Sequence, residues 1–175
     1  MEQKDASKQK VYIQYYDSPC GELILASAGD ALCLCDWFEM PCAERNKRRL
    51  TRLLHADFIE ETSPILEQTK QELNEYFAGK RKTFDIPLHP VGTDFQKQVW
   101  QALLEIPYGE TRTYKEIAQR VNNLKGVRAV AQAIGANGMS ILIPCHRVIG
   151  TNHSLTGFAG GIDAKRLLLN IERKK

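Results

Sequence analysis

The sequence predicts an α+β protein: a small N-terminal antiparallel sheet with helices, followed by a mostly helical C-terminal domain that contains a helix-turn-helix. Residues 11–38 are rich in strand-forming residues, whereas residues 93–136 carry two helix-capping boxes and apolar residues at helical spacing. Between these parts, residues 80–92 contain two prolines and lack a sustained periodicity. We therefore expect two domains, residues 1–92 and 93–175.

The N-terminal part begins with strands. Turn signals at residues 19–21 and 28–30 divide residues 11–38 into three short strands, which predicts an antiparallel meander. Charged residues with interleaved leucines predict a helix over residues 44–52, and residues 57–61 are expected to add a short strand. Ser63 and Pro64 then supply an N-cap and a first helical residue for a helix that stops at Gly79.

The C-terminal part is predicted to be helical. Two capping boxes begin helices here: Thr93 with Gln96, and Thr113 with Glu116. After a turn at residues 122–126, residues 127–136 are rich in alanine and glycine and predict a slender helix. Two short helices joined by a tight, glycine-containing turn are the pattern of a helix-turn-helix. A last helix is expected to turn Leu167, Leu168 and Ile171 inward.

Composition restricts the partners and the compartment. The net charge is +3, so a contact with nucleic acid would need a local basic surface. No apolar run is long enough to span a bilayer and no secretory signal is recognised, so a cytoplasmic protein is expected, or a nuclear one in a eukaryote. The five cysteines lack CxxC spacing and are odd in number, which predicts at least one free thiol.

Cys145 is the candidate nucleophile. It follows an apolar run and lies beside His146 and Arg147, and cationic neighbours favour a thiolate. The alternative is a buried, inert thiol, which is the commoner role of a free cysteine. On an extended chain His146 would point away from Cys145, so it is expected to act through a water. Glu172 could orient the histidine or be a solvated helix charge.

The segment Ile143-Pro144-Cys145-His146-Arg147-Val148 resembles the active-site motif of the methylated-DNA–protein-cysteine methyltransferases. Similar segments occur in family order at residues 95–100, 128–130 and 157–161, together with Asn137. The resemblance runs from Thr93 to Glu172, whereas the first half matches only in length, position and general pattern.

The resemblance implies DNA repair by direct reversal. Cys145 would take the alkyl group from O6 of guanine irreversibly, in a single turnover, activated by Glu172 through His146 and a water. Tyr114 would donate its phenolic proton to the leaving guanine. O4-alkylthymine is a second candidate substrate. The resemblance implies no cofactor and no membrane, and the expected partner of this monomer is double-stranded DNA containing O6-alkylguanine.

The resemblance also implies how DNA is held. The slender helix would enter the minor groove, and Arg128 would fill the space left in the stack by the flipped nucleotide. Further DNA contacts are expected from Tyr114, Thr93, Gln96, Lys125, Ala129 and Gly135. The substrate pocket would be formed by the hinge residue Asn137, the backbone of Val148, and Gly157, Phe158 and Ala159.

Two residues depart from the family pattern: Gly138 stands where many members have proline, and Ala159 where some have serine. Glycine loosens the turn and alanine offers only its backbone N–H, so substrate range and rate are affected rather than the reaction. Some relatives hold zinc in the first half, and Cys33 and Cys35 would share one strand face with Cys20, His55 or His89 as partners. No ligand spacing is diagnostic, so no metal is expected.

Two other functions use the same residues. A helix-turn-helix regulator could sense alkylation or oxidation at Cys145. A cysteine hydrolase could use Cys145 and His146 as an acyl-transfer dyad, although nothing in the sequence suggests its substrate.

Overall fold

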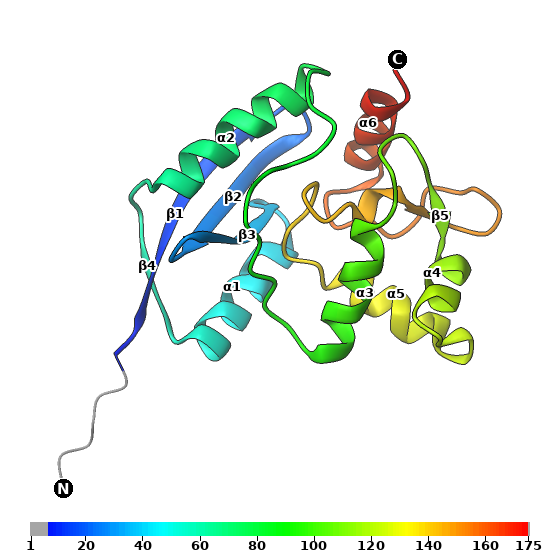
Figure 1. Ribbon diagram of the computed structural model, residues 1–175, viewed down its shortest axis with the longest axis horizontal. Coiled ribbons are helices and arrows are strands. Elements are labelled where there is room, and N and C mark those ends of the chain that lie inside the picture. The colour runs from blue at the N-terminus through cyan, green and yellow to red at the C-terminus, as the bar shows by residue number, and fades with distance from the viewer. Residues whose placement is uncertain (1–6, 175) are drawn as a thin grey trace, which may run out of the picture.

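A computed structural model describes residues 7–174 (Figure 1). The first half contains β1 (Gln9–Ser18), β2 (Gly21–Ala28), β3 (Ala31–Trp37), α1 (Pro41–Leu54), β4 (Ala56–Ile59) and α2 (Pro64–Phe77). The second half contains α3 (Asp94–Leu104), β5 (Arg112–Thr113), α4 (Tyr114–Arg120), the 3-10 turn η1 (Leu124–Gly126), α5 (Val127–Gly135), the 3-10 turn η2 (Cys145–Arg147), β6 (Val148–Ile149) and α6 (Ile162–Arg173). The predicted fold class is confirmed. None of the described helices is long and apolar enough to cross a membrane.

The four-stranded sheet has the order β3-β2-β1-β4. Strands β1, β2 and β3 form the predicted antiparallel meander. Strand β4, however, pairs parallel with β1, so the predicted antiparallel sheet is mixed at this edge. Helix α1 causes the difference: it returns the chain between β3 and β4, so β4 runs in the same direction as β3 and β1.

The two helices of the first half cover opposite faces of this sheet. Leu50 of α1 packs with Val11 and Ile24, while Leu73 of α2 packs with Leu23 on the other face. Because both faces are buried, β2 is almost continuously apolar. Helix α1 begins at Pro41, three residues before the predicted start, because proline suits the first position of a helix.

A bulge in β3 separates two cysteines that were expected to share a face. The register between β2 and β3 shifts where Ala26 pairs with Leu34 and Ser27 pairs with Leu32, which leaves Cys33 as the extra residue. Cys33 therefore packs in the cluster covered by α1, whereas Cys35 packs in the cluster on the opposite face. The prediction that Cys33 and Cys35 share one strand face is therefore wrong.

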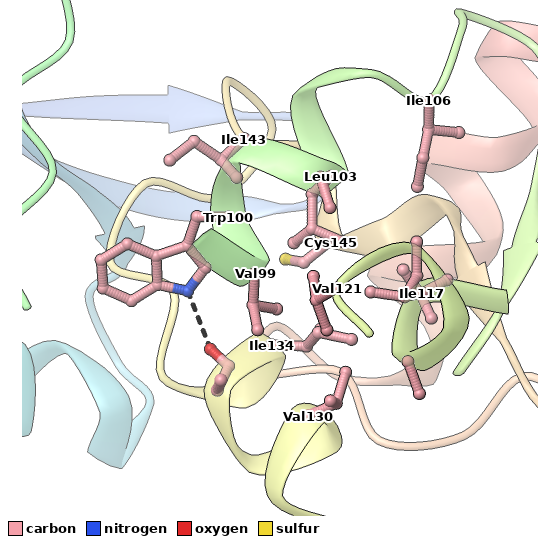
Figure 2. Packing of buried hydrophobic residues seen from close by; sticks show 14 of the residues in the cluster. Val99, Trp100, Leu103, Ile106, Ile117, Val121, Val130, Ile134, Ile143 and Cys145 are labelled. Carbon is pink, nitrogen blue, oxygen red and sulfur yellow. Dashed lines mark hydrogen bonds between the residues drawn. The ribbon is translucent and has the colours of Figure 1, made fainter. Parts of the chain in front are cut away.

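The second half is built around α3, whose apolar stripe contacts α4, α5 and the segment that carries Cys145 (Figure 2). Val99 and Leu103 are fully buried at its centre. The Trp100 indole donates a hydrogen bond of 2.8 Å to the carbonyl of Ala133, which fixes α5 against α3 (Figure 2). The last helix differs from expectation, since Leu167 is exposed and Leu169 is buried beside Leu168.

The edge of the first sheet holds the loop between α5 and the active-site segment. The Cys35 amide donates to the Gly138 carbonyl, and the Ser140 amide donates to the Cys35 carbonyl. The Trp37 indole adds a hydrogen bond of 3.1 Å to the Ser140 hydroxyl. The turn at Gly138, which lacks the rigidity of proline, is therefore restrained by the neighbouring β3.

We predict that Gly160→Ala destabilises the protein. A Cβ atom at Gly160 would lie 2.5 Å from the Trp37 ring, which is buried and held by Ser140, so either the ring or the loop must move. Overpacking of this kind costs about 1–3 kcal/mol. Thermal unfolding measures the effect. Gly135→Ala is the matched control: it has open space in α5 and should raise the midpoint, with a gain of up to ~1 kcal/mol. Equal midpoints for the two variants would contradict the packing.

Candidate active site

Cys145 lies at the start of a 3-10 turn rather than on an extended strand. Cys145, His146 and Arg147 form η2, whose three side chains are all buried. The preceding turn is held by the Asn137 side chain, which donates to the Ile143 carbonyl at 3.0 Å and accepts from the Met139 amide at 2.9 Å. Asn137 therefore fixes the path of the chain from α5 to the candidate nucleophile.

A two-stranded ladder positions Tyr114 relative to Cys145. Strand β5 leads directly into α4, whose first residue is Tyr114, and β6 follows directly after η2. The two strands pair parallel, with Arg112 opposite Val148. The ladder thereby brings Tyr114 and Cys145, which are about thirty positions apart, to one site. The sequence predicted that both belong to the site but could not position them.

The thiol of Cys145 is protonated at rest. The residue is 7% exposed, and burial raises the pKa of its thiol, although the Asn137 side chain and the Lys165 ammonium act in the opposite direction. Burial also lowers the pKa of His146, so the imidazole is neutral at neutral pH, and Arg147 is paired elsewhere. Neither His146 nor Arg147 therefore supplies a free positive charge that would favour a resting thiolate, and a base must take the proton when the sulfur reacts.

Glu172 is the carboxylate that orients the histidine. It is buried on α6, and its Oε1 atom lies 2.7 Å from Nε2 of His146. Arg147 donates to both carboxylate oxygens, from Nε to Oε2 and from Nη2 to Oε1, each at 2.9 Å. These hydrogen bonds and charges outweigh the opposing effect of burial and lower the pKa of Glu172 to about 2. The alternative of a solvated helix charge is therefore excluded.

An ionised Glu172 decides which nitrogen of His146 carries the proton. A carboxylate can only accept hydrogen bonds, so Nε2 must be the donor and Nδ1 the free acceptor. Nδ1 is buried and has no hydrogen-bond partner among residues 7–174. This nitrogen is suited to take the thiol proton, directly or through a water.

Cys145, His146 and Glu172 form a chain of groups that we call the relay. The first half of the protein contributes a side chain to it that sequence reasoning did not identify. The Tyr76 hydroxyl, on α2, donates to Oε1 of Glu172 at 2.8 Å. Tyr76 is fully buried, and burial followed by the charge of Glu172 raises its pKa, so it stays protonated. A tyrosine on an otherwise apolar helix face was the available signal, because a buried hydroxyl needs a partner.

Lys165 is a second group that the sequence analysis missed. Its ammonium is buried on α6 and donates to the carbonyls of Val148 and Thr156, at 2.5 and 3.1 Å. The Tyr114 hydroxyl donates to the same Thr156 carbonyl at 3.1 Å, and burial raises its pKa. Lys165 thus ties the segment after Cys145 to the loop that holds Tyr114.

The expected pocket residues lie around this loop. Val148 and Asn137 are buried, and a Cβ atom at Gly157 would lie 3.4 Å from the Tyr114 hydroxyl. Phe158 packs edge-to-face on Trp37, with ring centroids 5.8 Å apart. Ala159 is partly buried beside it.

Apart from Tyr114, the expected DNA-binding residues lie away from the buried groups around Cys145. Arg128, Ala129 and Gly135 are exposed along α5, and Lys125 is exposed in the turn before it. Thr93 and Gln96 begin α3, where each side chain bonds the other's backbone amide, so their capping groups are already used. The start of α3 and helices α4 and α5 lie along the lower side of Figure 1.

Glu172 also links stability to pH. Its pKa is depressed from an ordinary value near 4.5 to about 2, so the ionised pair contributes stability above pH 4.5. That contribution is lost as the pH falls from 4.5 through 2, because the unfolded chain binds the proton first.

We predict that Tyr76→Phe lowers stability at pH 7 by about 1.5–3 kcal/mol, the usual contribution of a hydrogen bond to a charged group. Tyr108→Phe is the matched control in the same aromatic cluster, since its hydroxyl makes only a 3.4 Å contact with the Ile171 carbonyl. Urea denaturation measures both. If Tyr76→Phe lowered the free energy of unfolding no more than Tyr108→Phe does, the hydrogen bond to Glu172 would not stabilise the protein.

Known proteins match both halves of the chain. Residues 11–90 match the ribonuclease-like domain of 6-O-methylguanine DNA methyltransferase, and residues 94–174 match its DNA binding domain. A methylated-DNA–protein-cysteine methyltransferase of Haemophilus influenzae is 42% identical over 93% of this chain and 87% of its own length. The constitutive one of Bacillus subtilis is 45% identical over 92% of this chain and 96% of its own.

Solved structures agree. The O6-methylguanine methyltransferase of Mycobacterium tuberculosis has a TM-score of 0.79 and 41% identity, over 93% of each chain. The same organism's OGT in complex with DNA has a TM-score of 0.77 and 41% identity, over 94% of this chain and 92% of that one. With both halves matched in order and at this identity, the chain belongs to the 6-O-methylguanine DNA methyltransferase family.

Proposed function

We propose that this protein repairs DNA by moving an alkyl group from O6 of guanine to the sulfur of Cys145. The observation that carries the proposal is the buried chain of groups behind that sulfur: a neutral His146 whose Nδ1 is free and whose Nε2 is bonded to an ionised Glu172. Such a set has the order of nucleophile, base and orienting carboxylate. The proposed substrate, O6-alkylated guanine in DNA, is taken from the names of the relatives.

The transfer requires one proton to leave Cys145 and one to reach guanine. His146 Nδ1 takes the thiol proton through a water, and Glu172 stabilises the resulting imidazolium. The sulfur then attacks the alkyl carbon, and the bond from that carbon to O6 breaks. The electron pair stays on guanine, which takes the proton of the Tyr114 hydroxyl, and the resulting phenolate regains a proton through solvent as the His146 imidazolium returns to its neutral form. The product is a thioether, which has no good leaving group, so each molecule reacts once.

DNA is the proposed partner, bound through the helix-turn-helix. The exposed face of α5 carries Ala129 and Gly135, which are small enough for close approach to a minor groove, and Arg128 lies at its N-terminal end. A base inside a duplex cannot reach Cys145, so the nucleotide must rotate out, and Arg128 would fill the gap. Every relay group comes from one chain, so a monomer suffices.

The proposal predicts a stoichiometric mass gain. Incubation with a duplex that contains O6-methylguanine should add one methylene to the intact protein and restore guanine in the DNA. Cys145→Ser should show no gain, while Cys20→Ser, which alters a thiol outside the site, should react normally. Intact-mass spectrometry before and after incubation reads the result. Multiple turnovers, or a gain that persists in Cys145→Ser, would overturn the assignment and favour a hydrolase or another acceptor.

A second prediction tests the role of Arg128. Arg128→Ala should slow transfer on duplex DNA, because extrusion costs a few kcal/mol of unstacking and unpairing that the arginine offsets. The loss should be smaller on a single-stranded oligonucleotide, where the base is already unpaired. Single-turnover rates on both substrates give the comparison. Equal losses would assign Arg128 to general phosphate binding.

A further inference from the structure

The net positive charge of the chain is concentrated on one helix of the first half. Helix α1 carries one acidic residue, Glu44, and five cationic ones, namely Arg45, Lys47, Arg48, Arg49 and Arg52. Its net charge is +4, whereas the whole chain has +3, so the remaining residues together carry −1. This helix lies outside the helix-turn-helix and has no part in the relay.

Helix α1 lies beside the C-terminal end of α5. The Arg45 guanidinium donates to the Gly135 carbonyl and the Arg49 guanidinium donates to the Ala136 carbonyl, each at 2.9 Å. Arg49 also stacks over Trp100, 5.9 Å from the ring centre. In Figure 1 the two helices lie on the same lower side of the molecule. The cationic helix is therefore next to the proposed DNA-binding face.

A shallow, open hollow of about 490 Å³ lies along the outer face of α1, and all of its lining residues belong to this helix: Pro41, Glu44, Arg45, Arg48, Arg49 and Arg52. Their arrangement opposes stability, because Arg45 with Arg49 and Arg48 with Arg52 are like charges four residues apart on one helix. The ion pair of Arg48 with Glu44, at 3.4 Å, is exposed and weak. Arg45 and Arg49 are compensated by the α5 carbonyls, so the exposed Arg48 and Arg52 are the members of this group that are best suited to an external anion.

We propose that this hollow binds backbone phosphates of the DNA duplex beside the damaged base, so that the first half of the protein extends the DNA-binding surface. The inference rests on the proposed function. The planar guanidinium of arginine can bind two phosphate oxygens at once, and contacts to phosphates do not depend on the DNA sequence. Because α1 adjoins only the C-terminal end of α5, the added contacts lie on one side of the lesion.

The stretch of α1 that carries the cations sets the size of the added footprint. The eight residues from Arg45 to Arg52 span roughly 12 Å, which corresponds to about three to four base-pair steps of B-DNA. The surface therefore matters only for duplexes that continue by about that length on the correct side of the lesion.

The test uses Arg48→Ala combined with Arg52→Ala, because neither side chain bonds α5 or belongs to the relay. Affinity is measured by titrating duplexes in which O6-methylguanine lies near one end, near the other end, or centrally. Loss of two phosphate contacts should weaken binding roughly 10- to 60-fold at 0.1 M salt and reduce the slope of log K against log salt by about 1.8. This loss of affinity should be absent for one of the two end-placed lesions, namely the one whose duplex ends on the side of the lesion that faces α1. Lys80→Ala with Lys82→Ala, in the connection after α2, is the charge-matched control and should change little.

The outcomes separate this inference from the proposed function. Transfer from the free base O6-methylguanine should be the same in the double variant and the parent, which confirms an intact site. If the parent transfers methyl from DNA but the double variant binds all three duplexes as tightly, the inference fails alone. Equal losses for both end-placed lesions would also overturn it, because they would indicate a general effect of charge. A parent that gains no methyl group refutes the proposed function itself.

Discussion

The Glu172 carboxylate is a buried anion on which three other side chains depend. Its oxygens accept from His146, from both ends of the Arg147 fork and from Tyr76, and its charge fixes which nitrogen of the imidazole stays free. A charge in an apolar interior is stable only when it is paired and fully hydrogen-bonded. The relay is therefore also a structural element: α2, α6 and the turn at Cys145 are held together by the groups that would perform the chemistry.

This arrangement gives the first half of the protein a direct part in the site. Tyr76 reaches the carboxylate from α2, and the edge of β3 holds the loop at Gly138 and Ser140 through backbone hydrogen bonds. On the other side of the sheet, Arg45 and Arg49 bind the last carbonyls of α5, where the helix dipole favours cations. Through β3 and α1, the first half of the chain thus positions both the nucleophile segment and the helix proposed to enter the groove.

The sequence analysis predicted the elements well because their signals are local. Capping boxes at Thr93 and Thr113 appear in the structure with both reciprocal bonds, and the motif around Cys145 needed no geometry to be recognised. The errors concern interactions between distant residues. The bulge at Cys33 depends on pairing with β2, and the pKa of Cys145 depends on burial and on Lys165 rather than on its sequence neighbours. Tyr76 was missed because its partner lies 96 residues away.

The central claim is that the resting site holds a neutral imidazole with its proton on Nε2, poised to take a proton at Nδ1. Nitrogen NMR of the His146 ring measures this directly, because protonated and unprotonated ring nitrogens resonate far apart. At pH 7 we expect a protonated Nε2 and an unprotonated Nδ1, and this pattern should persist below pH 6.5, since burial lowers the pKa of His146. A doubly protonated ring at pH 7, or a proton on Nδ1, would contradict the account.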